Sequence, residues 1–473
     1  MGEGDAAVSI TSPASPPANL SRCAGEVETR SGEGEGDRVG TLFLLRADPI
    51  TLTLGAARLD LSRRRRERFS SWAGEVYETA MLAPTPFSIA IPDATIAAIH
   101  QRIRDFPWAA IPVLEEQGDP WSADASVPFM RELCDHWLHH FHWRAQEAAI
   151  NRFPQFIANI AGQDIHFLHE RGSGAHDIAL VLTHGWPGSI VEFLHVIDRF
   201  AHPERFGGAA EHGIDVVVPA LPGFGFSGRP AAPIGPRGVA ALWDRLLREA
   251  LGYQRYIAQG GDWGSMVSAM AGLHHAAPQG GCIAIHLNML GTRGDAGPAN
   301  DEERAFEQRC QPFLRDGWAY AETHRTTPQT LAYAMADNPV AQAAWIVDKF
   351  HAWSDLRGGK DLREVHSLDA LLTNLMFYVA TGNFATATWI YRAAHTEGVR
   401  RLTPGTRIGV PKGFASFACE LRPRPPRGLL EKTYNLVHFS EFDRGGHFAA
   451  LEQPDLFVDD VGAFVRQIRQ RRG

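Results

Sequence analysis

The chain has 473 residues, is 44% hydrophobic and 10% aromatic, and carries a formal net charge of −8 at pH 7. This length allows two or three domain-sized units with a large apolar core. The acidic balance argues against a nucleic-acid partner, which would favour a basic face, and no stretch approaches the roughly 18 to 20 consecutive apolar residues of a membrane span. We therefore predict a globular protein with no nucleic-acid partner and no integral membrane anchor.

The N-terminal residues 1–84 differ in composition from the rest of the chain. Ser, Gly, Glu and Pro dominate as far as Asp37, with little apolar periodicity, and this composition is typical of disorder. The tetra-Arg run at 63–66 is interpreted as a solvated charge run. We predict that 1–84 is a disordered or non-native extension, and that translation begins at Met81 or that the extension is dispensable.

The cysteines are scattered, odd in number and without metal-ligand spacing; they are Cys23, Cys134, Cys282, Cys310 and Cys419. The chain does not begin with a basic and then apolar signal peptide. Free thiols in a reducing compartment fit this pattern best. We therefore expect a soluble cytoplasmic protein without a metal site.

From Pro86 the apolar pattern becomes regular. Residues 87–91 alternate like a short strand, and Pro92-Asp93 then begins an amphipathic helix whose apolar residues recur at helical spacing as Ile96, Ile99, Ile103 and Phe106. A dense run of aromatic residues follows as far as Phe156, and such residues usually pack a core or a domain interface. Residues 85–155 are predicted to form a separate N-terminal domain.

Strands and helices alternate in residues 156–290, give way to a long helical stretch at 291–395, and resume at 396–473. Short apolar strands between helices indicate an α/β fold with a mostly parallel central sheet flanked by helices. The helical stretch is predicted to be a lid, inserted after about the sixth strand, over the carboxyl edge of the sheet where ligands bind in open α/β folds. The predicted strands are 164–168, 178–182, 214–218, 256–258, 283–286, 407–410 and 434–439, and the helices include 238–251 and 455–468.

The stretch from Tyr256 to Ser265 has the pattern of a nucleophile elbow, which is a tight turn between a strand and a helix. Gly260 and Gly264 flank Asp262, and glycine suits a strained turn that passes close to its neighbours. A carboxylate is ionised at pH 7 and can attack an sp³ carbon without the help of a base. Asp262 is thus a candidate nucleophile; the alternative is a glycine-rich turn in which Asp262 caps a helix.

A glycine-rich turn at 184–188 follows an earlier strand and could direct backbone N–H groups at this elbow. In such folds the oxyanion hole takes one N–H from the residue after the nucleophile, here Trp263, and one from this earlier loop, here Trp186. Taken alone, residues 184–188 would be a plain Gly-Pro turn. Their place before the elbow in the order of elements favours the oxyanion role.

His447 stands between the last predicted strand and the last helix. The chain order nucleophile, acid, histidine is that of α/β-hydrolases, and the acid belongs in the loop after the preceding strand. Glu420 is the first carboxylate in that loop. Asp262, Glu420 and His447 therefore form a candidate catalytic triad, with Asp295 and Asp355 as weaker rivals for the acid.

Four motifs together resemble those of the microsomal-type epoxide hydrolases: HGWPGS at 184–189, PGFGFS at 222–227, GGDWG at 260–264 and RGGHFAALEQP at 444–454. Residues 142–156 and 166–172 are similar to the N-terminal domain of that family, so the resemblance runs from about Pro86 to Phe464. It implies an α/β-hydrolase fold whose N-terminal domain packs on core and lid. It also implies hydrolysis of a small apolar epoxide without a cofactor or metal.

The resemblance implies Asp262 as the nucleophile, His447 as the base that activates water and Glu420 as the acid that orients this base. It also implies two tyrosines from the lid. Tyr320 and Tyr391 fit these two positions, with Tyr333 and Tyr378 as alternatives. Two phenol O–H groups directed at the ring oxygen would stabilise its developing negative charge.

Two other functions are compatible with the same pattern. A haloalkane dehalogenase uses Asp, His and a second acid in this fold, and needs indole or amide N–H groups for the halide, a role that Trp263 could fill. A small-molecule binding protein could keep the fold without turnover, although it would have no use for a buried carboxylate beside a base. The oligomeric state is left open, with a homodimer as one form.

Overall fold

The computed structural model describes residues 83–295 and 297–471. Nearly all of the predicted N-terminal extension lies outside the described residues, together with Met81, the tetra-Arg run and Cys23. Within the described residues, the four cysteines are free thiols, as expected; they are Cys134, Cys282, Cys310 and Cys419.

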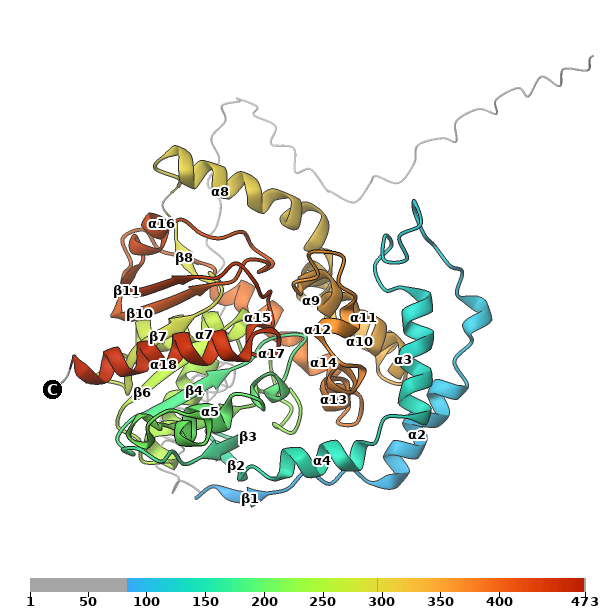
Figure 1. The fold of residues 1–473 in the computed structure, drawn as a ribbon, viewed down its shortest axis with the longest axis horizontal. Helices are drawn as coiled ribbons and strands as arrows, with labels where there is room; N and C mark the ends of the chain where they lie inside the picture. Colours follow the sequence, from blue (N-terminus) through green and yellow to red (C-terminus); the bar gives the residue numbers. More distant parts are fainter. Residues whose placement is uncertain (1–82, 296, 472–473) are drawn as a thin grey trace, which may run out of the picture. The chain divides into compact units, whose positions relative to one another are not determined.

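A nine-stranded sheet runs in the order β1-β2-β3-β5-β4-β6-β7-β10-β11 (Figure 1). Strands β1, β2, β3 and β5 pair antiparallel in that order, and the pairings from β5 to β11 are parallel. The predicted mostly parallel sheet is therefore confirmed. The strands are β1 (Thr85–Phe87), β2 (Gln155–Ile160), β3 (Gln163–Glu170), β4 (Ala179–Thr183), β5 (Asp215–Pro219), β6 (Tyr256–Gly260), β7 (Cys282–Leu287), β10 (Ile408–Ser416) and β11 (Tyr434–Glu441).

The first predicted strand, 87–91, is displaced in the structure. β1 ends at Phe87, and β2, its antiparallel partner, was not predicted. Beyond β1 the backbone N–H groups of Ile89 and Ile91 bond to side chains, the Asn151 amide at 2.9 Å and the Glu147 carboxylate at 2.7 Å. The alternating apolar residues thus face the core in a segment whose hydrogen bonds come from a helix.

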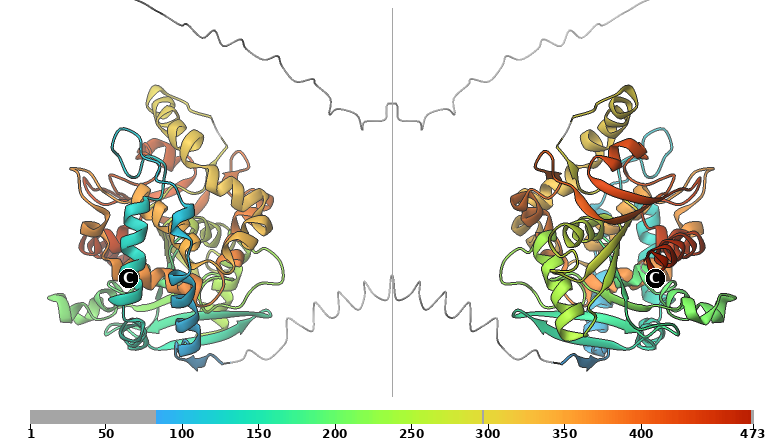
Figure 2. Two further views of the ribbon diagram at one scale, coloured as in Figure 1. Left: turned by 90° about the vertical axis from the view of Figure 1, so that its right-hand side faces the viewer. Right: turned by 90° about the vertical axis from the view of Figure 1, so that its left-hand side faces the viewer.

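Helices cover both faces of the sheet, because its central strands are apolar on both sides. Figure 2 shows α6 and α7 on one face and α18 on the other. The predicted helices at 238–251 and 455–468 are both present, the first ending in a π-helical turn at Leu246–Ala250. The core helices are α5 (Ile197–Ala201), α6 (Pro236–Arg245), α7 (Asp262–His274), α16 (Arg427–Glu431), α17 (Ala449–Glu452) and α18 (Pro454–Gln470).

A helical insertion lies between β7 and β10, where the lid was predicted. Two short strands, β8 (Arg293–Gly294) and β9 (Arg401–Leu402), pair in parallel at its two ends. This pairing joins the entry and exit of the insertion. The insertion consists of α8 (Asp301–Pro312), α9 (Ala319–Thr326), α10 (Pro328–Met335), α11 (Pro339–Trp353), α12 (Leu362–Val365), α13 (Leu368–Val379), α14 (Phe384–Ala387) and α15 (Trp389–Glu397).

Two of the three N-terminal helices, α2 and α3, pack on the lid. The N-terminal helices are α2 (Asp93–Arg104), α3 (Val127–His139) and α4 (Trp143–Asn151). α2 and α3 lie side by side and both contact α11 of the lid (Figure 2). Ile99 and Ile103 of the predicted helix are buried, which agrees with their helical spacing.

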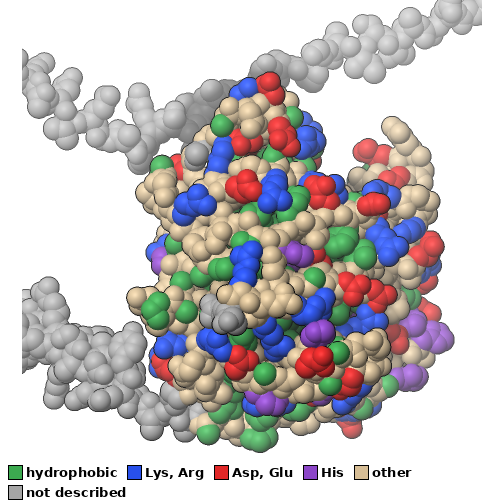
Figure 3. Space-filling model, turned by 60° about the vertical axis from the view of Figure 1, so that its left-hand side comes forward, with side chains coloured by type: hydrophobic (Ala, Val, Ile, Leu, Met, Phe, Trp, Pro, Cys, Tyr) green, Lys and Arg blue, Asp and Glu red, His purple; other side chains and the backbone are tan. Residues whose placement is uncertain are grey.

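The surface of the described residues mixes both signs of charge, with acidic and basic side chains interspersed on the face drawn in Figure 3. None of the helices within 83–295 and 297–471 combines the length and the apolar character that crossing a bilayer requires.

A buried polar cluster links the sheet to α18. The Asp460 carboxylate accepts hydrogen bonds from the Nε2 atoms of His286 on β7, at 2.8 Å, and His438 on β11, at 2.7 Å. Burial alone would raise the pKa of Asp460, but these hydrogen bonds hold it well below its ordinary value. The ionised carboxylate therefore stabilises the fold above the pKa of about 4 that Asp has when unfolded, and this stabilisation is lost as the pH falls through the lower folded pKa.

We expect Asp460→Asn to lower the free energy of unfolding by about 2 to 4 kcal/mol, because it removes one partner of a buried charged cluster. Asp459→Asn, on the exposed side of the same helix, is the matched control and should change little. Thermal unfolding at neutral pH measures both. Equal melting temperatures for the two variants would show that the cluster contributes nothing.

Candidate active site

Four loops meet at the carboxyl edge of the parallel strands. They follow β4, β6, β10 and β11 and carry Trp186, Asp262, Glu420 and His447 respectively. Because the ends of neighbouring parallel strands point the same way, residues far apart in sequence converge here. The predicted triad and oxyanion residues therefore occupy one site.

The turn that carries Asp262 is strained and tightly packed, as the glycine pattern predicts. Asp262 begins α7 with φ at +40°, a conformation that costs a non-glycine residue free energy. A Cβ atom on Gly264 would lie 1.9 Å from the Thr183 carbonyl oxygen, and one on Gly260 would lie 2.2 Å from the Gly264 carbonyl carbon. Only glycine fits at either position, so the turn can bring Asp262 up against β4.

The loop after β4 holds the Asp262 carboxylate. The Trp186 backbone N–H donates to Asp262 Oδ1 at 2.9 Å, and a Cβ on Gly185 would lie 2.2 Å from the same oxygen. Burial raises the pKa of Asp262, while the His447 charge and the backbone N–H groups of Trp186 and Trp263 oppose the rise. The two N–H groups predicted for the oxyanion hole thus both act on this carboxylate.

His447 lies between two carboxylates. Its Nδ1 is 2.7 Å from Glu420 Oε1, and its Nε2 is 3.6 Å from Asp262 Oδ2. Burial by itself would lower the pKa of His447, but the charges of Glu420 and Asp262 outweigh it and raise this pKa to about 9. The imidazole is therefore a cation in the resting site, with a partner on each ring nitrogen.

The two alternative acids, Asp295 and Asp355, do not contact the His447 imidazole. Asp295 is exposed. Asp355 accepts from the Gly445 N–H at 2.9 Å and pairs with Arg357 at 2.7 Å, so its carboxylate holds the loop before His447 and does not contact the imidazole. Among the three candidates, Glu420 has the geometry of the orienting acid.

A further carboxylate that the sequence analysis did not single out also fixes the histidine loop. Glu452 accepts from the backbone N–H groups of Gly446 at 2.9 Å and Phe448 at 3.0 Å, on either side of His447. The backbone N–H of His447 donates to the backbone carbonyl of Trp353 in the lid at 2.9 Å. Glu452 lies within the RGGHFAALEQP motif, and this position in the motif could have identified it from the sequence.

The two lid tyrosines lie over the nucleophile turn. The Tyr320 ring stacks on Trp186 with centroids 5.2 Å apart, and the Tyr391 ring meets Trp263 edge-on at 4.6 Å. Both are buried, and each hydroxyl affects the pKa of the other, so the two phenol groups lie close together. Burial and the Asp262 charge hold the pKa of each phenol above its ordinary value, so both remain O–H donors.

The alternative tyrosines are placed for other roles. Tyr333 is 82% exposed. The Tyr378 hydroxyl donates to the Gly188 carbonyl at 2.5 Å, and Asn374 on the same helix donates to the Pro187 carbonyl at 2.8 Å. Helix α13 of the lid thus supports the turn that carries Trp186.

Glu192 is a partly buried carboxylate beside the site that the sequence analysis also missed. Its Oε1 lies 1.7 Å from where a Cβ on Gly188 would be, so glycine at 188 makes room for it. Burial raises the pKa of Glu192 to about 8, against the opposing effect of the His447 charge, and Asp262 adds to the rise. Glu192 is the one acid in an apolar stretch directly after the HGWPGS motif, and this could have identified it from the sequence.

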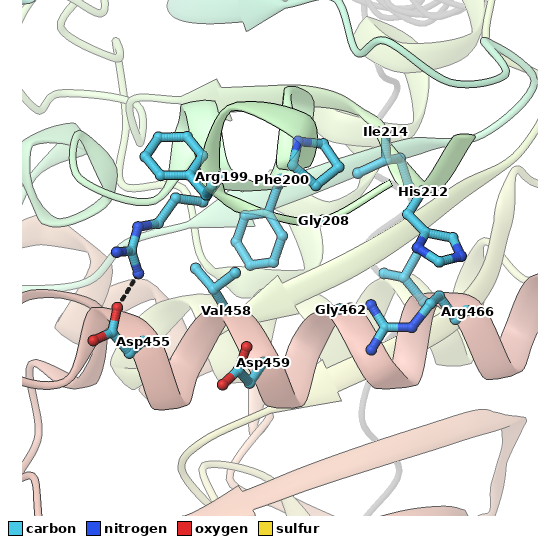
Figure 4. Close-up of a pocket in the computed structure, with 13 residues that line it drawn as sticks. Arg199, Phe200, Gly208, His212, Ile214, Asp455, Val458, Asp459, Gly462 and Arg466 are labelled. Carbon is cyan, nitrogen blue, oxygen red and sulfur yellow. Dashed lines mark hydrogen bonds and ion pairs between the residues drawn. The ribbon is translucent and has the colours of Figure 1, made fainter. Parts of the chain in front are cut away.

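Two other features of the described residues lie away from this site. A cavity of about 440 Å³ between the segment around Phe200 and α18 contains none of the predicted site residues (Figure 4). The only set of three side chains with metal-ligand atoms close together among these residues is the cluster His286, His438 and Asp460, in which both histidines already bond to the carboxylate.

Comparison with known proteins agrees with this geometry. Residues 84–193 match the family model described as the epoxide hydrolase N terminus, and residues 178–293 match that of the alpha/beta hydrolase fold. A putative epoxide hydrolase of Stigmatella aurantiaca is 37% identical over 82% of this chain and 86% of its own, and epoxide hydrolase 1 of Sus scrofa is 32% identical over 82% and 89%.

Solved structures extend the likeness to three dimensions. The structure of Aspergillus niger epoxide hydrolase matches with a TM-score of 0.69 and 32% identity, over 82% of this chain and 97% of that one. The sequence and structural comparisons cover the core, the lid and the N-terminal helices together. The chain therefore has the α/β-hydrolase fold, belongs to the microsomal-type epoxide hydrolase family and is an epoxide hydrolase.

Proposed function

We propose that this enzyme opens an apolar epoxide through a covalent ester on Asp262 and releases a vicinal diol. The observation that carries the proposal is the position of the Asp262 carboxylate, between the Trp186 N–H on one side and the His447–Glu420 pair on the other. The apolar character of the substrate, the cytoplasmic location and the oligomeric state stay predictions. Family membership leaves dehalogenation and binding without turnover unsupported.

In the first step, an Asp262 oxygen attacks a ring carbon and the carbon–oxygen bond of the epoxide breaks. The leaving oxygen gains negative charge where Tyr320 and Tyr391 provide two O–H donors in a buried setting. Preorganised donors in such a site stabilise developing charge strongly. A tyrosine O–H proton passes to the leaving oxygen, and the proton that the imidazolium gives up restores the phenol. The products of this step are a hydroxyalkyl ester of Asp262 and a neutral His447.

In the second step, His447 takes a proton from water, and the water oxygen attacks the ester carbonyl. The ester has lost the Asp262 charge, which is one of the causes that raise the His447 pKa. Alkylation thus lowers this pKa and makes the imidazole available as a base. The N–H groups of Trp186 and Trp263 stabilise the tetrahedral oxyanion. When the ester breaks, the leaving alkoxide takes the proton of the new carboxyl group, which gives the diol, ionised Asp262 and protonated His447.

The nucleophile is tested by Asp262→Ala and by isotope labelling. We expect this variant to stay folded and to lose turnover by about 10⁴-fold or more, because the covalent route is gone. Wild-type enzyme in a single turnover in ¹⁸O-water should place the label in Asp262 and none in the diol, since water attacks the ester carbonyl. Label in the first diol released would make Asp262 a general base.

The division between the two steps is tested by His447→Gln. Alkylation needs no base, whereas hydrolysis does, so this variant should accumulate the ester. Intact mass after mixing with styrene oxide should rise by one substrate molecule, and peptide mapping should locate the adduct on Asp262. A folded His447→Gln protein that hydrolyses styrene oxide at the wild-type rate would exclude His447 as the base.

The lid phenols are tested by Tyr320→Phe and Tyr391→Phe. Each should slow alkylation by about 100-fold and leave ester hydrolysis nearly unchanged, because the ring oxygen has already left by the second step. Stopped-flow Trp fluorescence resolves the two steps. Tyr333→Phe, at an exposed lid position, is the control. Unchanged alkylation in both variants would mean that other groups hold the leaving oxygen.

A further inference from the structure

A second cavity, of about 380 Å³, lies against helix α8. Most of its wall is apolar and is formed by residues from the loop after β7, from α8 and from the segment that follows α8. Four arginines also line it, at positions 293, 400, 401 and 422. The mechanism above uses none of these residues.

Two of these arginines, Arg400 and Arg422, are partly buried and form no ion pair with an acidic side chain in the described part of the chain. Arg293 pairs with Glu307, the one carboxylate in the cavity wall, at 2.5 Å. Within the described residues no carboxylate forms an ion pair with Arg400 or Arg422. The one side-chain hydrogen bond found for either guanidinium is from Arg422 to the Leu290 carbonyl, at 3.3 Å.

Both guanidiniums are fixed on aromatic faces. Arg400 lies 4.4 Å from the ring centroid of Trp318, and Arg422 lies 5.9 Å from the same ring. Stacking of this kind orients a guanidinium but leaves the N–H groups at its edge free. The two guanidinium groups are thus held in place, and some of their N–H groups remain free to donate hydrogen bonds.

Desolvation of the Arg400 and Arg422 cations costs free energy. Burial first, and then the neighbouring Arg422 charge, lower the pKa of Arg400 to about 10. Burial likewise lowers the pKa of Arg422. The charge of Asp262 favours the Arg400 cation and that of Glu420 favours the Arg422 cation, but each effect is smaller than that of burial. An anion bonded to both guanidiniums would offset the cost of desolvation.

Side chains of the cavity wall contact aromatic residues of the active site. Arg400 also lies over the ring of Trp263, the residue after the nucleophile, at 5.4 Å. Trp318, the platform of both arginines, lies 6.1 Å from the ring of Tyr320. The charges of Asp262 and of the lid tyrosines also act on Arg400, so this guanidinium lies near the reacting groups, with the rings of Trp263 and Tyr320 next to the cavity wall.

We propose that Arg400 and Arg422 form a subsite for a carboxylate carried by the substrate, and that the enzyme acts on epoxides with an apolar chain that ends in a carboxylate. This inference rests on the proposed reaction at Asp262. The apolar wall accommodates the hydrocarbon chain. The planar guanidinium groups of Arg400 and Arg422 can each donate parallel N–H···O bonds to the planar carboxylate. The subsite binds the substrate and takes no part in bond breaking.

The experiment compares terminal epoxides whose ring is joined to a carboxylate by chains of increasing length. Each acid is assayed beside its methyl ester, and styrene oxide is the uncharged reference. In wild-type enzyme, kcat/KM for the acid of matching length should exceed that for its ester by about tenfold or more. Arg400→Gln and Arg422→Gln should bring this ratio close to one. Because the ratio is taken within each variant, changes common to both substrates cancel.

Arg309→Gln is the matched control, since Arg309 is exposed on α8, the helix that lines the cavity with its other face. It should keep the wild-type ratio. Melting temperatures establish that each variant is folded. A second measurement needs no variant: saturated carboxylic acids should inhibit styrene oxide hydrolysis by the wild type competitively, and the corresponding alcohols should do so about tenfold less.

An acid-to-ester ratio at or below one for every chain length in the wild type would overturn the subsite. A preference for acids that persists in folded Arg400→Gln and Arg422→Gln would also overturn it, as would equal inhibition by acids and alcohols. Absence of diol from styrene oxide and from all the epoxides would instead refute the proposed reaction. The two failures are therefore distinguishable.

Discussion

Two carboxylates share one buried imidazole, and much of the surrounding structure serves to hold that arrangement. Glu420 and Asp262 lie on opposite sides of His447, at 2.7 and 3.6 Å, in a site closed by the lid. Their charges keep the imidazole protonated at rest, because attraction between charges is strong where water is excluded. Glu192 nearby has its pKa raised to about 8, so the site does not carry a third negative charge near neutral pH.

This charge balance ties the two proposed steps together. While Asp262 is ionised it is a nucleophile, and its charge stabilises the imidazolium beside it. Once Asp262 is an ester, that stabilisation is gone and the His447 pKa falls, so the imidazolium gives up its proton. The neutral imidazole, still held by Glu420, can then accept a proton from water. One covalent bond thereby changes His447 from a counter-ion into a base, and no movement of the protein is required.

The lid also helps to build the site that it covers. Asn374 and Tyr378 of α13 donate to the carbonyls of Pro187 and Gly188, next to the Trp186 N–H that bonds Asp262. The backbone carbonyl of Trp353 in α11 accepts a hydrogen bond from the backbone N–H of His447. Because α2 and α3 pack in turn on α11, the N-terminal helices support the position of the histidine. We expect lid movements to be small at these contacts for that reason.

The sequence by itself determined the fold class, the family and the residues of the triad. The strand–turn–helix pattern at 256–273, with glycine on both sides of Asp262, follows from local sterics, since a Cβ at 260 would lie 2.2 Å from the Gly264 carbonyl carbon. The order of Asp262, Glu420 and His447 follows from the chain. These features are encoded within short segments, so they can be recognised without coordinates.

Only the tertiary structure decided which of several similar residues occupy the site. Tyr378 and Asp355 were candidates by position, and their hydrogen bonds assign them to supporting loops. Glu192, Arg400 and Arg422 acquire their properties from burial beside residues that are distant in sequence. A pKa, an unpaired charge or a cavity wall depends on which segments pack together, and no local pattern contains that information.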